Sequence, residues 1–160
     1  MAFQIHDATT AADLAGVAAL FRQYADWLEE ALDISPQTHG IDAEIEHLPR
    51  PYAPPDGALI AARSEGGTHV GCIGLRRLDE QSCEVKRLFV RPEQRGERLG
   101  EKLVAALIEK ARTLGYSQVV LDVGEYQKPA IALYRKCGFR EIAPKDHISY
   151  AGVVFMVYDL

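Results

Sequence analysis

Two stretches of the chain repeat large apolar residues at steps of three and four, with mostly small or polar residues between them. In residues 11–32 the repeat consists of Leu14, Val17, Phe21, Tyr24, Leu28 and Leu32, and in residues 99–114 it consists of Leu99, Leu103, Leu107, Ala111 and Leu114. This spacing places one apolar stripe on each of two long helices. Each large side chain buried on such a stripe contributes about 1.5–3 kcal/mol, so packing against a core stabilises the second helix in particular.

Shorter apolar and β-branched runs, separated by glycine or polar turns, predict strands. The predicted strands cover residues 3–8, 57–63, 68–78, 83–90, 117–123, 139–142 and 152–158. Pro129 near the start and Gly138 past the end bracket another helix, and residues 41–48 suit a short one. Ser35-Pro36 ends the first long helix. The resulting order of elements predicts an α/β chain in which helices cover the faces of a mixed sheet.

The composition is that of one globular domain spanning residues 1–160. With 48% apolar residues and a net charge of −5, the chain offers no overall basic field for nucleic acid or an anionic membrane. No apolar run approaches the roughly 20 residues that span a bilayer, and residues 1–7 lack the pattern of a signal peptide. The cysteines and histidines have no metal or redox spacing. We therefore expect a cytoplasmic protein without a bound metal.

The strongest chemical signal lies at residues 83–103. A predicted strand ends at Val90, turns at Arg91-Pro92 and passes through a loop at residues 95–100 that opens directly into the second long helix. Unpaired backbone N–H groups and the positive end of the helix dipole would then lie at the tip of a strand. The same place gathers the cationic side chains of Arg91, Arg95, Arg98 and Lys102. The arrangement predicts a site for a phosphate or pyrophosphate.

Two common phosphate-binding loops fit these residues poorly. A Walker A loop ends in Gly-Lys-Ser/Thr, whereas this loop ends in Leu99-Gly100-Glu101. A dinucleotide-binding fingerprint has three glycines in a parallel unit near the N-terminus, whereas this loop has two glycines after an antiparallel meander. The residues indicate a different family of phosphate-binding loop.

Two sequences resemble the signatures of the GNAT superfamily of N-acetyltransferases, namely R-G-E-R-L-G at 95–100 and A-L-Y-R-K-C-G-F at 132–139. The resemblance implies a mostly antiparallel, twisted sheet of about six to seven strands, splayed after the fourth and flanked by helices. Three residues depart from the family pattern: Arg95 takes the first position of the loop motif, Arg98 replaces its middle glycine, and Gln127 replaces an asparagine. Arg98 costs nothing if the residue is helical with its side chain outward, whereas a positive φ there would strain the backbone; in either case we expect it to contact a phosphate.

The resemblance also implies acetyl-coenzyme A as co-substrate. Its phosphates would lie on the loop amides and its pantetheine arm along the strand that ends at Val90, where the amide of Leu88 would polarise the thioester carbonyl. The cofactor-binding residues would be Leu88, Phe89, Val90, Arg95, Gly96, Glu97, Arg98, Leu99, Gly100, Glu101 and Gln127.

Acyl transfer to an amine needs a base for the ammonium and an acid for the departing thiolate. Tyr134 holds the family's acid position, although an aromatic residue in a helix can also belong to the core. Glu84 is the candidate base, because it lies eleven residues before Arg95, a spacing that resembles that of the base glutamate in the family's histone-acetylating branch. Strand alternation places Glu84, Lys86 and Leu88 on one face. The alternatives are that water carries the proton away without a fixed base, and that Glu84 is a solvated strand residue or forms an ion pair with Lys86 or Arg87. No cysteine has a visible histidine partner, so direct transfer in a ternary complex is favoured over an acyl-cysteine intermediate.

The family builds its acceptor pocket from the first helices and the loop before the last strand. Here these segments include Tyr24, Trp27, Glu44 and Tyr150, whose aromatic and acidic side chains suit a cationic amine but fit a surface or core position equally well. We expect an N-acetyltransferase acting on the primary amine of a small molecule or amino-acid-like acceptor, with a homodimer as one candidate assembly. The alternatives are an acetyltransferase for protein lysines or N-termini, and a non-catalytic acyl-CoA-binding sensor module.

Overall fold

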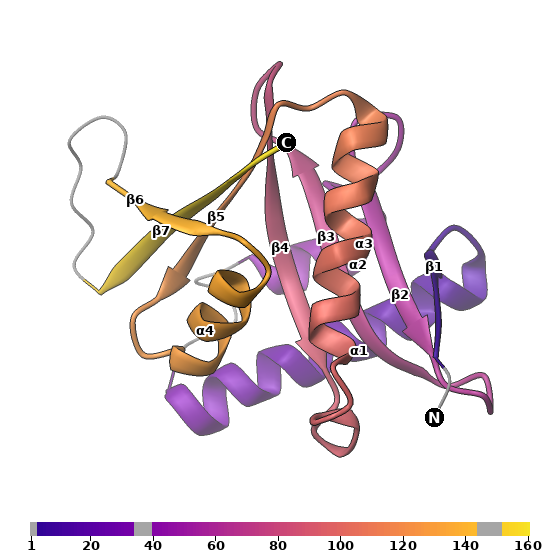
Figure 1. Cartoon of the computed structure of the whole chain (residues 1–160). Coiled ribbons are helices and arrows are strands. Elements are labelled where there is room, and N and C mark those ends of the chain that lie inside the picture. The colour runs from indigo at the N-terminus through magenta and orange to yellow at the C-terminus, as the bar shows by residue number, and fades with distance from the viewer. Residues whose placement is uncertain (1–2, 34–39, 144–151) are drawn as a thin grey trace.

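Seven strands form one sheet in a computed structural model that describes residues 3–33, 40–143 and 152–160, in the order β1-β2-β3-β4-β5-β7-β6 (Figure 1). The strands are β1 (Gln4–Asp7), β2 (Ala58–Arg63), β3 (His69–Arg77), β4 (Ser82–Val90), β5 (Gln118–Gly124), β6 (Arg140–Ile142) and β7 (Val153–Asp159). The helices are α1 (Ala11–Leu32), α2 (Ile41–His47), α3 (Leu99–Leu114) and α4 (Lys128–Lys136), and a 3-10 turn, η2 (Pro92–Gln94), precedes α3. The predicted mixed α/β fold and its order of elements are confirmed.

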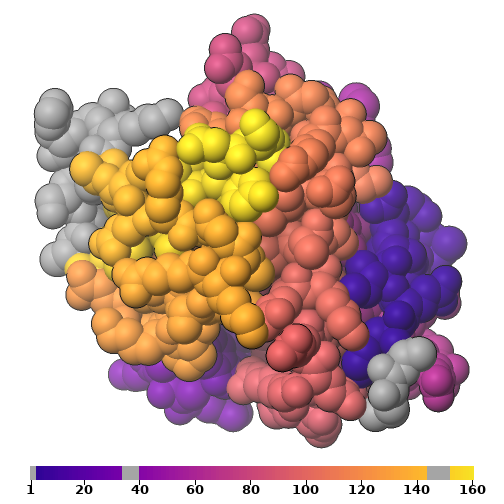
Figure 2. Space-filling view, in the orientation of Figure 1, coloured from indigo at the N-terminus to yellow at the C-terminus, as the bar shows by residue number. Residues whose placement is uncertain are grey.

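Helices cover both faces of the sheet, so the domain has two apolar cores. In Figure 1, α1 lies behind the sheet and α3 in front of it. One core joins the sheet to α3 and α4 through residues such as Leu103, Leu107 and Ile131. The other joins it to α1 and α2 through residues such as Phe21 and Ile41. Figure 2 shows that α3 runs between the N-terminal strand and the C-terminal elements on its face of the molecule.

The sheet opens between β4 and β5. These two strands are parallel and pair only over Ser82–Glu84, opposite residues 118–120, whereas every other strand pair is antiparallel. Beyond this point β4 stays paired with β3 as far as Val90, and β5 stays paired with β7 as far as Gly124. The predicted splay after the fourth strand is thereby confirmed, and it leaves a V-shaped opening at the end of β4 that leads to the loop before α3.

Strand β4 carries a bulge at Arg87. Lys86 pairs with Gly74 and Phe89 pairs with Cys72, so β4 has one more residue than β3 between these two pairs. Arg87 has a φ of 61°, in the left-handed region that residues other than glycine seldom occupy. A bulge of this kind bends a strand and re-aims the side chains that follow it.

The bulge overturns one expectation about β4. Val85 packs in the core under α3, so its neighbours Glu84 and Lys86 point to the opposite, α1 face. Simple alternation would put Leu88 on that same α1 face. After the inserted residue, Leu88 instead packs with the α3-side core and Phe89 with the α1-side core. The prediction that Leu88 shares a face with Glu84 and Lys86 is therefore wrong, because it assumed an unbroken strand.

The first long helix begins and ends where the apolar repeat predicts. Thr10 caps it, with its Oγ1 accepting the amide N–H of Asp13 at 3.1 Å, and Asp33 follows it with a left-handed backbone. The predicted stop at residues 35–36 lies outside the described residues. No helix in the described part of the chain is long and apolar enough to cross a membrane.

Candidate functional site

The loop between β4 and α3 has a conformation that exposes backbone donors. Gly96 has a φ of 95°, and Arg98 occupies the position before the first turn of α3 with φ 61° and ψ 23°. No side chain caps this end of α3. The first N–H groups of the helix therefore lack a side-chain cap, which is the arrangement expected at an anion site.

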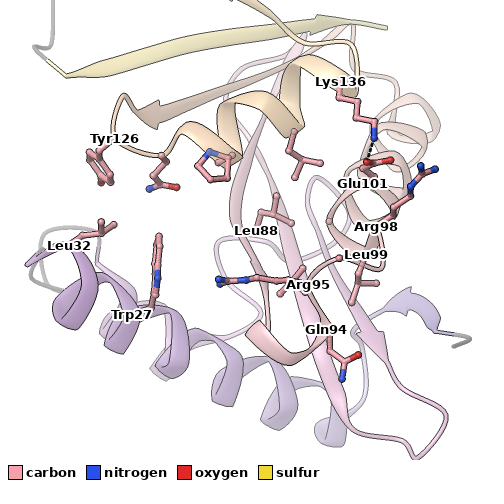
Figure 3. A pocket seen from close by; sticks show the side chains of 17 residues that line it. Trp27, Leu32, Leu88, Gln94, Arg95, Arg98, Leu99, Glu101, Tyr126 and Lys136 are labelled. Carbon is pink, nitrogen blue, oxygen red and sulfur yellow. Dashed lines mark ion pairs between the residues drawn. The ribbon is translucent and has the colours of Figure 1, made fainter.

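Arg98 is left-handed and not helical, so of the two conformations that the sequence left open, the strained one is present. A left-handed residue with a side chain costs roughly 1–2 kcal/mol relative to the ordinary helical region. Figure 3 shows the Arg98 side chain on the same side of the site as Glu101. The contact of Arg98 with a phosphate stays a prediction.

Replacing Arg98 with glycine or with alanine separates its backbone strain from its charge. Both changes remove the guanidinium, but only glycine adopts the positive φ without strain. We expect the Arg98→Gly protein to melt about 2–4 °C above the Arg98→Ala protein, corresponding to a difference of about 1 kcal/mol. Thermal unfolding measures this difference. Calorimetric titration with acetyl-CoA measures how much the guanidinium of Arg98 contributes to the binding affinity. Equal melting temperatures would contradict a left-handed residue 98, and wild-type affinity in both variants would contradict a phosphate contact.

A cavity of about 510 Å³ lies between this loop, α4 and the C-terminal part of α1 (Figure 3). Arg95 reaches into it from the loop, and Trp27 and Tyr126 lie toward its other end. Most of the predicted cofactor-binding residues line it, namely Leu88, Val90, Arg95, Gly96, Arg98, Leu99, Gly100, Glu101 and Gln127. The predicted residues Phe89 and Glu97 do not, and for Phe89 the reason is the bulge, which buries its side chain on the α1 face.

An ion pair lies at the N-terminus of α3 within this cavity. Lys136 of α4 contacts the carboxylate of Glu101 at 2.7 Å. The hydrogen bond from Lys136 lowers the pKa of Glu101, and Arg98 contributes in the same direction more weakly. Lys136 is a cationic group beside the helix terminus that the sequence motifs did not single out.

A second cavity of about 500 Å³ occupies the opening between β4 and β5. It shares part of its wall with the first cavity, because Leu88, Tyr126, Gln127 and Ala130 line both. A molecule lying along the first cavity could therefore extend past Leu88 into the opening of the sheet.

Tyr134 lines this second cavity from α4. Its residue is only 7% exposed, and its ring packs edge-on against Phe139 at a centroid distance of 5.5 Å. Burial raises the pKa of the Tyr134 phenol above its ordinary value, and the neighbouring Tyr24 raises it further. The hydroxyl therefore stays protonated at neutral pH, as a proton donor must.

Glu84 stands at the last position where β4 pairs with β5, and its carboxylate lies 3.9 Å from Lys86 Nζ, in line with the ion-pair alternative. Its carboxylate accepts a hydrogen bond from Arg76 Nε at 2.7 Å, and it is not among the residues that line either cavity. The carboxylate that does line the second cavity belongs to Asp122 of β5, which lies 3.5 Å from the ammonium of Lys86. Sequence reasoning missed Asp122, although it is the one charged residue in the apolar run of β5.

Two of the predicted acceptor residues lie together, because the rings of Tyr24 and Trp27 pack with their centroids 6.1 Å apart. Tyr24 lines the second cavity, whereas Trp27 lines the first. Glu44 lines neither, because its carboxylate is engaged by Arg87 through distances of 3.0 and 2.8 Å. Tyr150 lies outside the described residues.

The Glu44–Arg87 pair connects α2 to the bulge of β4. The Arg87 side chain is 6% exposed and that of Glu44 is 17% exposed, so the pair is largely buried. Tyr52 donates a hydrogen bond of 2.6 Å to the same carboxylate. Burial and this carboxylate both raise the pKa of Tyr52, so its hydroxyl remains a donor. The network holds the left-handed residue immediately before Leu88.

The cysteines of the described chain are poor nucleophiles. Cys72 and Cys83 are buried, and burial raises the pKa of each thiol to about 12. Burial also raises the pKa of Cys137. Because the thiolate is the reactive form, this chemistry does not favour an acyl-cysteine intermediate.

Comparisons with known proteins agree with this geometry. Residues 18–139 match the model of the acetyltransferase (GNAT) family. An uncharacterized N-acetyltransferase of Schizosaccharomyces pombe is 39% identical over 133 residues, which cover 82% of this chain and 80% of that protein. A Klebsiella pneumoniae structure assigned as an acyl-CoA N-acyltransferase is 32% identical, with a TM-score of 0.73 over 99% of this chain and 97% of its own.

A more distant solved structure shares the fold alone. PaiA N-acetyltransferase from Thermoplasma acidophilum, solved in complex with coenzyme A, has a TM-score of 0.79 at 17% identity over 100% of both chains. The family match covers residues 18–139, from within α1 to just past the end of α4. This range includes both sequence motifs and most of the residues that line the two cavities. The chain therefore belongs to the acetyltransferase (GNAT) family and is an acyltransferase that uses an acyl-CoA.

Proposed function

We propose that the protein transfers an acetyl group from acetyl-CoA directly to the primary amine of a small acceptor in a ternary complex. The observation that carries this proposal is the pair of adjoining cavities that share Leu88 and Gln127, one at the phosphate-binding loop and one containing Tyr134. A co-substrate in the first cavity and an acceptor in the second would meet at Leu88. Cavities of about 300–1,000 Å³ are typical of small-molecule sites, and both fall in this range.

The co-substrate would be held mainly by the loop. The amides at the start of α3 and the guanidinium of Arg95 offer donors and positive charge to the pyrophosphate. The thioester carbonyl would lie at the amide of Leu88, which would stabilise the oxyanion that forms when the amine attacks. As the tetrahedral intermediate collapses, the C–S bond breaks and the departing sulfur takes the proton of the Tyr134 hydroxyl.

The amine must lose a proton before it attacks. Glu84 stays a candidate base, but the hydrogen bond from Arg76 and its position outside the cavity do not favour it. Asp122 or a water molecule beside it is better placed, because Asp122 lines the cavity that would hold the acceptor.

The charges of the second cavity suit an amino-acid-like acceptor. Lys86 and Asp122 face each other across the opening at 3.5 Å, with side chains 27% and 42% exposed. An acceptor that carries an ammonium and a carboxylate offers a partner of the opposite sign to each. We place this reaction in the cytoplasm, which keeps free thiols such as Cys137 reduced.

Thermal unfolding with acetyl-CoA and thiol release across an amine panel test this function. At a free concentration of one hundred times Kd, acetyl-CoA should stabilise the fold by about 2.7 kcal/mol, which raises Tm by roughly 5–11 °C. Thiol release should be fastest with an amino acid or other small amine and slower with a lysine-containing peptide. No shift with acetyl-CoA or longer acyl-CoAs would refute the co-substrate. A shift without turnover on any amine would favour a sensor, and turnover on the peptide alone would favour a protein acceptor.

A further inference from the structure

Three potential metal ligands meet at one place outside the acyl-transfer cavities. His6 of β1 and His69 of β3 each place Nε2 at 2.9 Å from Oδ1 of Asp13, in the first turn of α1. The donor atoms of the three residues all lie within 4.8 Å of one another. The side chains of His6, Asp13 and His69 are 19%, 7% and 13% exposed, so the cluster is mostly buried but reaches solvent. None of the three lines either cavity of the proposed reaction.

The fold gives this cluster a defined shape. Strands β1 and β3 flank β2, which brings the two imidazoles to the same side of the sheet beneath α1. Asp13 is fixed by the cap at the start of α1, where its own amide donates to Thr10 Oγ1. Gly16 leaves the space that the His69 ring occupies, since a Cβ at residue 16 would lie 2.2 Å from His69 Nδ1. The ligand-bearing side chains are therefore positioned by backbone elements and not by a loop.

The ligand types and their spacing match zinc chemistry. Zinc takes imidazole nitrogens and carboxylate oxygens at about 2.0–2.2 Å, so neighbouring ligand atoms in a tetrahedral site lie roughly 3.3 Å apart. The observed separations of 2.9 Å from each Nε2 to Oδ1 need to widen by a few tenths of an ångström, and the two imidazoles, whose ligand atoms lie within 4.8 Å of each other, would close to the same spacing around the ion. Three protein ligands leave the fourth position for water, which the partial exposure of both histidines allows.

The second nitrogen of His6 bears on the same question. His6 Nδ1 is buried and has no hydrogen-bond partner among the described residues. In the metal-free cluster Nε2 of His6 donates its proton to the Asp13 carboxylate, so a metal on Nε2 would displace that proton and the ring would carry its proton on Nδ1. We propose that His6, Asp13 and His69 bind one divalent transition-metal ion, zinc(II) by ligand preference, and that the ion joins β1, α1 and β3.

Zinc binding to the chelator-treated, full-length protein tests this proposal. Calorimetric titration should give one zinc ion per chain, and free zinc at one hundred times Kd should raise Tm by roughly 5–11 °C. His69→Gln should abolish both effects. The matched control is His47→Gln, which changes an exposed histidine on α2 and should leave both intact. Binding below one equivalent in the wild-type protein, or unchanged binding in His69→Gln, would overturn the site.

X-ray absorption on the zinc-loaded wild-type protein keeps the test decisive if His69→Gln does not fold. Two imidazoles with nitrogen and oxygen ligands at about 2.0–2.2 Å are expected. Sulfur ligands at about 2.3 Å would instead place the metal on a cysteine and overturn the proposal. Because the readouts are metal content and coordination, the result does not depend on whether the protein acetylates a given amine.

Discussion

Tyr134→Phe is expected to lower kcat by about 10²–10⁴-fold, the usual contribution of a positioned general acid, while acetyl-CoA affinity stays close to that of the wild-type protein. The substitution removes only the hydroxyl that would protonate the departing sulfur. The ring that packs against Phe139 is retained, so the α4 packing should persist. The loss should therefore appear in the chemical step and not in binding or folding.

Steady-state kinetics with the best amine and calorimetric titration with acetyl-CoA measure the two quantities. Tyr126→Phe is the matched control, because Tyr126 lines the same cavity but is 48% exposed, and it should retain nearly full kcat. Burial raises the pKa of Tyr134, so the protonated form persists as pH rises, and no loss of activity from this group is expected below about pH 10. Wild-type kcat in Tyr134→Phe would rule out its acid role.

Glu44→Gln is expected to reduce the free energy of unfolding by about 3–5 kcal/mol, toward the lower end because Glu44 is partly exposed. The change keeps the size of the side chain but leaves the guanidinium of Arg87 in a buried place without its carboxylate. Tyr52 loses its strongest acceptor at the same time. A charge that remains buried after its counter-ion is removed carries most of its desolvation penalty, and for this reason the effect is large.

Urea unfolding measures this loss, and Glu46→Gln is the matched control. Glu46 lies on the same helix and is exposed, so its replacement should change stability by no more than about 0.5 kcal/mol. The folded fraction of Glu44→Gln should also show a lower kcat/KM, because the pair holds the bulge that orients Leu88. Equal stability of the two variants would show that the Glu44–Arg87 pair contributes nothing net to the fold.

Regular periodicity explains which parts of the fold the sequence predicts. The apolar stripe in residues 11–32 predicts where α1 begins and where it ends. Helix α3 begins at the predicted Leu99 and ends before Gly115. The strands lie within one or two residues of the predicted ranges, since turn residues mark their limits. The loop at residues 95–100 is also a local feature, so R-G-E-R-L-G was enough to predict where the first cavity lies.

Features made by distant residues escaped the sequence. Nothing in Val-Lys-Arg-Leu-Phe at 85–89 indicates a left-handed residue. The left-handed Arg87 pairs with Glu44 of α2, which is distant in the sequence. The expected face of Leu88 was wrong for this reason. His69 and Asp13 are 56 positions apart, so no spacing rule for metal ligands applies to them. In each case tertiary contact, not local propensity, decides the geometry.

The short seam between β4 and β5 has a mechanical consequence. Three residue pairs at Ser82–Glu84 are the whole strand pairing that joins the β1–β4 half of the sheet to the β5–β7 half in the described chain. A ligand lying in the opening would contact both halves of the sheet and restrict their motion relative to each other. A bound ligand would then stiffen the whole domain, including β6, which lines neither cavity.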